Sequence, residues 1–546
     1  MSSPALKRRT LVKGMTATLG LLALRGFTVK AQNRVHFTHG IASGDPLQDR
    51  VVLWSRVIPG SGAHRELTSQ WQVASDAAFK KIVSEGSITT DQARDYTLKV
   101  DAQGLKPGKS YFYRFLCDGV SSPVGGTKTL PKGKVREFRM GIASCSNYPQ
   151  GYFNAYADMA KADLDCVLHL GDYIYEYADG VYSNPIAVNE LGRRVKPDGE
   201  IIALEDYRMR YGLYRTDPDL QMLHATHPMI AVWDDHELMN NTWHSGAENH
   251  NEGEGDFATR IAAAKKAYHE WMPIRTRTSD QETIYRNFEI GNLADLTMLD
   301  TRLVGRDEQL EYGKDMGEDP RAFVAEKLLK NERELLGQDQ ALWLRDTLKQ
   351  SKQRGATWQI LGQQVLMGRL NIPQLDPELI EQADIPERNK NFMRGMAKLA
   401  ALKMPLNLDA WDGYPAARER LYQDLVAHAN NPVSLAGDTH NAWAFDLQTE
   451  DGVAVGVEIG TPGISSPGLE TYMPIPPTDA KQGLLDASPE LVYADTSQRG
   501  WTLMTVRPDS VRTRWRYVST ILSREYSVSE SEELVAPAGM RRFDKG

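Results

Sequence analysis

The stretch HLGDYIYEY (169–177) places a carboxylate and several phenols directly after an apolar, strand-like run. Asp172 and Tyr175 both carry oxygen atoms that can bind a metal ion. Cys145 follows an earlier apolar run and offers a thiol, which binds metals strongly once it is deprotonated. Each residue also has a plain structural interpretation, since Asp172 could cap a helix and Cys145 could pack in the core. One such motif therefore proves little by itself.

Further strand-like runs end in polar side chains of the same kinds. The runs 229–234, 357–364 and 432–438 deliver, in that order, Asp235 with His236, Gln363 with Gln364, and Asp438 with His440. In α/β folds, functional sites gather at the carboxyl ends of the strands. The sequence therefore predicts that these side chains meet at one sheet edge and bind metal. Asn240 and Asn241 could add amide oxygens to such a site.

The part of the chain that carries these runs, 136–546, reads as an α/β domain. Helical stretches separate most of the strands, for example Phe257 to Trp271, Asp339 to Lys352 and Ala416 to Asn430. Alternation of strands and helices predicts mixed sheets whose faces are covered by helices.

Residues 32–131 read differently, as short β-rich runs separated by turns. The expected strands are VVLWSRV (51–57), LTSQWQVASD (67–76), DYTLKVD (95–101) and SYFYRFLCDG (110–119). This spacing, with no good helix in between, predicts a small β-sandwich domain of the fibronectin-III-like kind.

Residues 1–31 have the order of an export signal: a basic segment, a modest apolar run and a small-residue cleavage site before Gln32. The adjacent Arg8 and Arg9 indicate the twin-arginine type, and an ordinary secretory signal with a chance arginine pair is the alternative. We therefore expect the twin-arginine export machinery as a partner and a periplasmic or secreted location. That route carries folded proteins, often with a cofactor already bound.

Composition narrows the function classes. A net charge of −8 and a pI near 5.9 argue against specific readout of nucleic acid. After residue 31, no apolar stretch approaches the roughly 20 residues needed to span a bilayer. The chain has only 3 cysteines, an odd number, which argues against a scaffold held together by disulfide bonds.

We expect the protein to be a monomer. An adhesion or sugar-binding protein built on the β-sandwich is the rival from another class, and the ligand set argues against it.

The order of the motifs resembles that of the binuclear metallophosphoesterases, and of purple acid phosphatases in particular, which carry an aspartate, GDxxY, GNHE, VxxH and GHxH. Here GDxxY is intact, Cys145 replaces the first aspartate, GNHE reads DDHE, VxxH is replaced near Gln363 and Gln364, and GHxH reads GDTH. These departures are similar to those of the PhoD family of alkaline phosphatases and phosphodiesterases. The segments that carry the resemblance are HGIASGDP (39–46), SCSNYPQGYFNAY (144–156), LGDYIYE (170–176), WDDHE (233–237) and LAGDTHNAW (435–443).

The resemblance implies a pair of metals, iron with one or two calcium ions. Thiolate, phenolate and imidazole from Cys145, Tyr175 and His440 suit Fe³⁺, a strong Lewis acid. Oxygen ligands from Asp235 and Asp438, with a Gln or Asn amide, suit Ca²⁺. Asp172 would bridge the two metals.

The implied activity is hydrolysis of phosphate monoesters or diesters at alkaline pH, on small molecules or on lipid or polymer phosphodiesters. A phospholipase-D-like phosphodiesterase on the same metals is the alternative. Attack by a metal-activated hydroxide requires no protein nucleophile, and the chain has no GxSxG motif. Asp172 and His236 are the candidate catalytic residues, and a structural hydrogen bond within WDDHE is the alternative for His236.

Two further expectations concern residues that could lie near the bound phosphate or at the mouth of the site. Arg208, Arg210, Arg215 or Arg302 could clamp phosphate, although arginines at such spacings more often pack on helix surfaces. The segment 521–546 keeps apolar residues, and the family resemblance suggests a lid at the mouth of the site. A disordered tail is the alternative.

Overall fold

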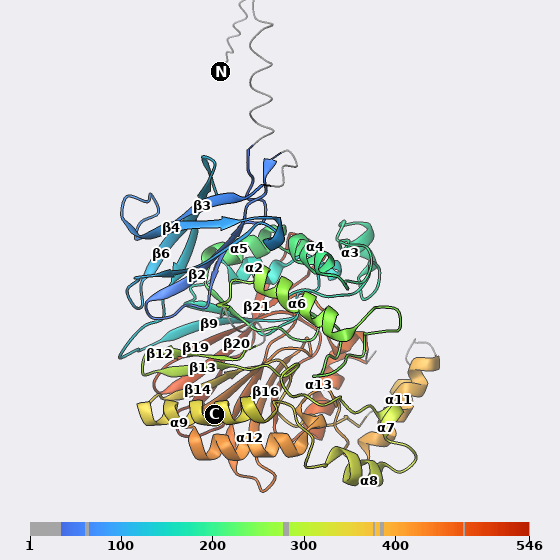
Figure 1. The fold of residues 1–546 in the computed structure, drawn as a ribbon. Helices are drawn as coiled ribbons and strands as arrows, with labels where there is room; N and C mark the ends of the chain where they lie inside the picture. Colours follow the sequence, from blue (N-terminus) through green and yellow to red (C-terminus); the bar gives the residue numbers. More distant parts are fainter. Residues whose placement is uncertain are drawn as a thin grey trace, which may run out of the picture.

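The computed structural model describes residues 34–544 apart from 61–64, 277–282, 375–376, 383–386 and 473–474. Its centre is a pair of β-sheets stacked face to face, with helices covering the outer faces (Figure 1). The expected mixed sheets between helices are therefore confirmed. The predicted export signal, residues 1–31, lies outside the described residues. Among the described helices, none is long and apolar enough to cross a membrane.

The first sheet has ten strands in the order β21-β20-β19-β9-β10-β11-β1-β2-β5, with β22 paired to β20. The strands are β1 (Ile41–Gly44), β2 (Arg50–Arg56), β5 (Thr97–Gln103), β9 (Phe138–Ala143), β10 (Cys166–His169), β11 (Met229–Ala231), β19 (Arg499–Val506), β20 (Ser510–Val518), β21 (Val528–Glu530) and β22 (Leu534–Pro537). At its centre β9, β10 and β11 are parallel neighbours, so their carboxyl ends lie at the same edge.

The second sheet has seven strands in the order β12-β13-β14-β15-β17-β16-β18. They are β12 (Arg286–Ile290), β13 (Ala294–Met298), β14 (Trp358–Gly362), β15 (Pro432–Ala436), β16 (Ala442–Gln448), β17 (Ala454–Gly460) and β18 (Leu491–Asp495). The strands β13, β14, β15 and β17 are parallel. A parallel bridge between Ser144, after β9, and Gly463, after β17, joins the ends of the two sheets.

Buried side chains explain the layers. Apolar residues of β9, β10 and β11 share one core with residues of β13, β14 and β15, because both sheets turn apolar faces toward each other. The helices α2 (Asn154–Met159), α4 (Leu204–Tyr214), α5 (Pro218–Thr226) and α6 (Phe257–Trp271) pack on the first sheet. The helices α9 (Gln338–Arg354) and α12 (Pro415–His428) cover the second. The other described α-helices are α3 (Pro185–Asn189), α7 (Tyr312–Asp315), α8 (Pro320–Phe323), α10 (Pro377–Gln382), α11 (Glu387–Ala400) and α13 (Pro477–Ala487).

The N-terminal β-rich unit is present, and its core lies between two sheets. One sheet is five-stranded and consists of β3 (Leu67–Ala74), β4 (Ile82–Thr90), β6 (Ser110–Cys117), β7 (Val120–Ser121) and β8 (Gly125–Lys128). The other consists of β1, β2 and β5, and β1 pairs with β11 at Gly44 and Met229. The expected separate sandwich is thus joined to the ten-stranded sheet by hydrogen bonds, and its fibronectin-III-like character stays a prediction.

The C-terminal segment 521–544 is ordered as part of the fold. Strands β21 and β22 pair with β20, and the buried Phe543 donates its backbone N–H to Asp446. Within this segment, Ile521 and Leu522 line a cavity that Tyr182 also lines. Strands β21 and β22 of this segment thus extend the sheet at β20, and the lid role stays a prediction.

Candidate metal centre

The loops after β9 and β10 carry Cys145 and Asp172 side by side. The backbone N–H of Cys145 donates to the carbonyl of Gly171 (3.1 Å), and Ser146 N–H donates to the carbonyl of Asp172 (2.8 Å). Both loops turn sharply, with φ of 61° at Cys145 and 57° at Asp172. Left-handed backbone at non-glycine residues is uncommon and concentrates at functional sites. Parallel pairing and these turns together bring the thiol and the carboxylate to one point.

The loop after β15 delivers Asp438 and His440, again from left-handed backbone, with φ of 59° and 63°. His440 Nδ1 lies 2.7 Å from the carbonyl oxygen of Pro467. Because a carbonyl only accepts, Nδ1 carries the proton and Nε2 is left free to bind a metal. Burial lowers the pKa of His440 to about 3, so the imidazole is neutral.

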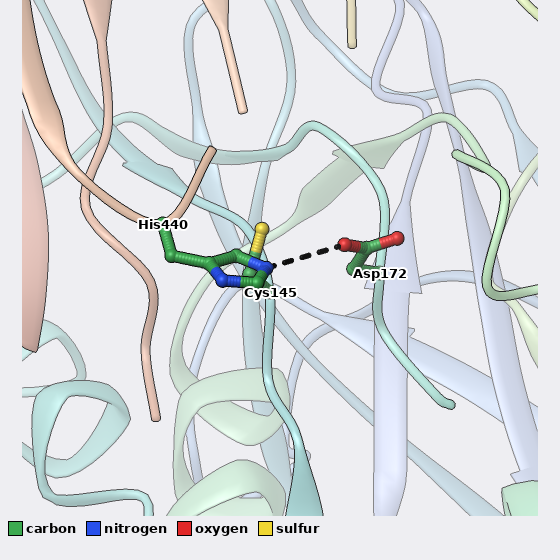
Figure 2. Close-up of side chains that lie close together, drawn as sticks. All are labelled: Cys145, Asp172 and His440. Atoms are coloured by element: carbon green, nitrogen blue, oxygen red, sulfur yellow. Dashed lines mark ion pairs between the residues drawn. The ribbon is translucent and has the colours of Figure 1, made fainter. Parts of the chain in front are cut away.

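Cys145, Asp172 and His440 form the first group of possible ligands (Figure 2). Their ligand atoms all lie within 4.8 Å of one another, and Nε2 of His440 is 4.0 Å from Oδ2 of Asp172. The Tyr175 hydroxyl joins them, 3.1 Å from Asp172 Oδ2, 3.3 Å from His440 Nε2 and 2.7 Å from Ser466 Oγ. The structure therefore brings together the four side chains that the sequence assigned to one ion.

Two more groups adjoin the first: Asp172 with Asp235 and His236, and Asp234 with Asp235 and Asp438. Asp172 belongs to both the first and the second group, as a bridging carboxylate would. His236 and Asp234 were not expected among the ligands, yet each belongs to one of these two groups. The structure thus holds neighbouring groups of possible ligands that share residues.

Buried charge makes these groups suited to cations. Burial, and then the neighbouring Asp172 carboxylate, raise the pKa of the Cys145 thiol well above its usual value. Burial likewise raises the pKa of Asp172, whose Oδ1 accepts no hydrogen bond from the described residues. Burial also raises the pKa of the Tyr175 phenol. A bound cation would reverse these shifts by stabilising the anions, so the donors fit a metal.

Arg302 reaches into the acidic side of the centre. Its guanidinium is fully buried, with Nε 2.5 Å from Asp234 Oδ1 and Nη2 3.0 Å from Asp438 Oδ1. Nη1 lies 2.8 Å from Asp409 Oδ2. Although burial alone would raise the pKa of Asp235, Arg302 and His236 lower it. Arg302 already compensates part of the negative charge of these carboxylates, so less negative charge remains for a metal cation to neutralise.

Two buried glutamates organise the loops. Glu237 accepts hydrogen bonds from the backbone N–H groups of Asp172 (2.9 Å), Tyr173 (2.6 Å) and Asp234 (2.8 Å). Glu176 lies 2.7 Å from Nδ1 of His236. The sequence did not single out either residue. Each is the last residue of a motif, GDYIYE or WDDHE, and that position could have identified it.

The four amide candidates make hydrogen bonds with the protein. Gln363 Oε1 accepts from the Trp411 indole, and Gln364 Oε1 accepts from the Thr301 hydroxyl. Asn240 and Asn241 direct their Nδ2 atoms to the same oxygen of Glu248, at 3.2 and 2.5 Å. Both glutamine oxygens thus hold neighbouring elements together, and an amide ligand from Gln or Asn stays a prediction.

Three of the four candidate arginines are structural. Arg208 pairs with Glu270, and Arg210 donates to backbone carbonyls, including that of Tyr175. The Arg215 guanidinium lies 4.1 Å from the centroid of the Trp54 ring. These buried or stacked positions leave Arg302 as the arginine that contacts the proposed ligands.

A layered α/β/β/α fold whose strand ends gather carboxylates, a thiol, a phenol and an imidazole is typical of metal-dependent hydrolases. Residues 140–515 match the profile of the PhoD-like phosphatase family, and residues 23–131 match that of the PhoD-like phosphatase N-terminal domain. The chain belongs to the PhoD-like phosphatase family, which confirms the resemblance drawn from its motifs.

Two relatives illustrate the match. Alkaline phosphatase D of Bacillus subtilis (strain 168) is 38% identical over 426 residues, covering 76% of this chain and 66% of the relative, just under two thirds of its length. A solved structure described as "Structure of PhoD" superposes with a TM-score of 0.78 at 32% identity. That superposition covers 93% of this chain and 91% of the other.

Proposed function

We propose that this protein is an alkaline phosphatase or phosphodiesterase that hydrolyses phosphate esters with Fe³⁺ and one or two Ca²⁺. The observation that carries the proposal is Asp172, which belongs to two of the three neighbouring ligand groups. Cys145, Tyr175 and His440 would hold the iron on one side. Asp235 and Asp438 would hold calcium on the other. When bound, such metals supply Lewis acidity toward the phosphoryl oxygens and an activated water as nucleophile.

The side chains around the metals orient the reacting groups. Glu176 fixes His236 through Nδ1, and His236 has a ring nitrogen within 4.8 Å of carboxylate oxygens of Asp172 and Asp235. Although burial alone would lower the pKa of His236, those carboxylates and Glu176 raise it well above its usual value. A protonated His236 would donate from Nε2 to a phosphoryl or leaving-group oxygen. Arg302 would hold Asp234 and Asp438 in place rather than touch substrate.

Metal analysis combined with spectroscopy tests the metal assignment. We expect iron and calcium in the purified protein and a visible charge-transfer band from thiolate or phenolate to Fe³⁺. Cys145→Ala should remove or shift that band and abolish activity, and calcium chelation should inactivate reversibly. Stoichiometric zinc without iron would exclude the assignment.

Paired assays separate the monoesterase from the phosphodiesterase, including the phospholipase-D-like alternative. Rates on p-nitrophenyl phosphate and its bis ester, measured on the same metal-loaded protein, give the preference directly. If neither ester is hydrolysed, the proposed activity is wrong.

For the cell, we propose twin-arginine export to the periplasm or the medium. The support is the Arg8-Arg9 pair before a short apolar run. Arg8→Lys together with Arg9→Lys should leave precursor in the cytoplasm. Normal export of the double variant would argue for the ordinary secretory route.

A further inference from the structure

An apolar cavity of about 420 Å³ adjoins the metal centre. Asp438 and His440 form part of its wall, and the rest includes Leu370, Met396, Leu406 and Leu469. Its volume falls in the range of small-molecule pockets, about 300–1,000 Å³. The cavity therefore opens from the point where the phosphate would be bound.

Elements far apart in sequence build this wall. Leu370 and Leu406 lie in neighbouring segments, since the Leu406 N–H donates to the Leu370 carbonyl (2.7 Å). Met396 belongs to α11, which lies beside α7 and α8 at one side of the molecule (Figure 1). Tyr472 stands at the rim with 56% of its surface exposed. Met396, Leu406 and Leu469 are only half-buried, so the cavity leaves apolar surface uncovered.

Three polar side chains in the wall already make hydrogen bonds with the protein. Asn441 Nδ2 donates to the Thr439 carbonyl, and Asn441 Oδ1 accepts from Leu469 N–H (3.1 Å). The Thr439 hydroxyl accepts from the Trp443 indole (2.8 Å), and Asn407 Oδ1 accepts from Asp409 N–H (2.9 Å). A sugar or polyol would lose its hydrogen bonds to water here and find few replacements. An alkyl chain loses nothing on entry.

We propose that this cavity binds the alkyl chain of the alcohol esterified to the phosphate, while the phosphate lies at the metal centre. The inference rests on the proposed hydrolase function and names its substrate class. In the reaction, water adds to phosphorus and the bond from phosphorus to the alkyl oxygen breaks. The alcohol leaves with one proton from the water, and phosphate retains the added oxygen.

A chain-length series tests the proposal on metal-loaded, full-length protein. The substrates are n-alkyl phosphates from methyl to octyl. Each buried methylene contributes about 0.8 kcal/mol, so kcat/KM should rise about threefold to fourfold per methylene until the cavity is filled. Met396→Asp and Leu406→Asp should each collapse the ratio of octyl to methyl rates. Met396→Leu should keep that ratio, because it preserves an apolar side chain of similar volume.

Leu402→Asp is the matched control, because Leu402 is 47% exposed and does not line the cavity. This variant should behave as the native protein toward every ester. A second measurement needs no variant: n-alkyl alcohols should inhibit methyl phosphate hydrolysis more strongly as the chain lengthens.

The outcomes distinguish a failure of the hydrolase function from a failure of the apolar subsite. If no ester is hydrolysed, the proposed function fails. If methyl phosphate is hydrolysed but both the substrate series and the alcohol series are flat, the apolar subsite is overturned while the hydrolase stands. A ratio that survives Met396→Asp and Leu406→Asp, with both variants folded, also overturns it.

Discussion

Oε2 of Glu176 lies 2.7 Å from Nδ1 of His236, and both side chains are buried beside the metal-binding groups. Glu176 also accepts from the Asn240 N–H (2.8 Å) and from Asn249 Nδ2 (2.9 Å). The rings of Tyr175 and Tyr177 lie against His236, with centroids 4.2 and 5.4 Å away. Two tyrosine rings thus pack against the imidazole, and the Glu176 carboxylate fixes its Nδ1.

Glu176→Gln tests that dependence. The amide nitrogen would face hydrogen-bond donors, so His236 should lose its fixed orientation. Loss of such a supporting carboxylate typically costs about 10–100-fold in activity or metal affinity. Steady-state kinetics with metal content measured in parallel would show the loss in kcat or in metal. Glu254→Gln, which removes a charge paired with Arg260, is the control and should stay near native. A native kcat in Glu176→Gln would contradict the proposal that Glu176 positions His236.

Asp172→Asn tests the shared ligand. The substitution removes the charge that would lie between two metals while keeping the shape of the side chain. We expect kcat to fall by at least about 100-fold, because electrostatic stabilisation in such sites is a large term. The circular dichroism spectrum should remain native, since Asp172 stands at a strand end. Near-native turnover with both metals retained would contradict the bridging role.

Gly171→Ala tests the close approach of two site loops. Gly171 has φ of +106°, and an added Cβ would lie 2.3 Å from Cβ of Asp234. The control is Gly180→Ala, where φ is +83° but nothing lies within 4 Å. Backbone strain alone should cost the control about 1–2 kcal/mol of unfolding free energy with little loss of activity. Gly171→Ala should cost more and should also lower kcat sharply. Equal effects in both variants would show that the clash does not matter.

Arg302→Met tests charge compensation in the acidic cluster. Removing one partner of a buried ion pair leaves uncompensated charge and costs about 3–5 kcal/mol. Urea unfolding of metal-free protein should show this loss, and added Ca²⁺ should restore part of it by replacing the missing positive charge. The control, Arg345→Met, breaks a partly exposed pair with Asp424 and should cost about 0–1 kcal/mol. If added Ca²⁺ does not raise the unfolding free energy of Arg302→Met, Arg302 does not compensate charge in this cluster.

Acid stability provides a test at His169, a buried residue outside the set of candidate ligands. Burial lowers the pKa of His169 to about 3 from its ordinary value of 6.5. Between these values the unfolded chain binds the proton and the folded protein does not, so stability falls as pH falls. The slope is about 1.4 kcal/mol per pH unit for one such group. His169→Gln should therefore make the measured slope of unfolding free energy shallower by that amount between pH 6 and 4.

Tyr156→Phe is the control for that measurement. Tyr156 places its hydroxyl 2.7 Å from Nε2 of His169, so the variant removes the hydrogen bond but leaves the imidazole buried. It should lower stability and keep the slope. A reduced slope in Tyr156→Phe would mean that the hydrogen bond, rather than burial, sets the pH dependence.

Local sequence patterns predicted most elements near the site. The expected helix Phe257 to Trp271 coincides with α6, and the expected run 432–438 contains β15. Strand β4 was missed, because its sequence IVSEGSITT is mostly exposed and lacks a clear apolar pattern. Ligand types were readable because polar residues directly after apolar runs stand out in a sequence.

The distribution of strands between sheets was not readable. The sequence predicted that the ligands lie at the edge of one sheet, but they come from two sheets. Strands β9, β10 and β11 belong to the ten-stranded sheet, and β15 belongs to the seven-stranded sheet. Parallel neighbours can be far apart in the chain, and hydrophobic alternation carries no information about which strand pairs with which. The stacking of the sheets, with the bridge from Ser144 to Gly463, brings the two sets of ligands together.

By itself, the sequence predicted the candidate ligands Cys145, Asp172, Tyr175 and His440 and the strand ends that carry them, because those depend on side-chain type and local pattern. Only the tertiary structure decided that Arg302 enters the acidic cluster, that Glu176 orients His236, and that an apolar cavity lies beside the metal centre. These features depend on contacts between residues distant in sequence, and such contacts form only when the two sheets and their loops pack together.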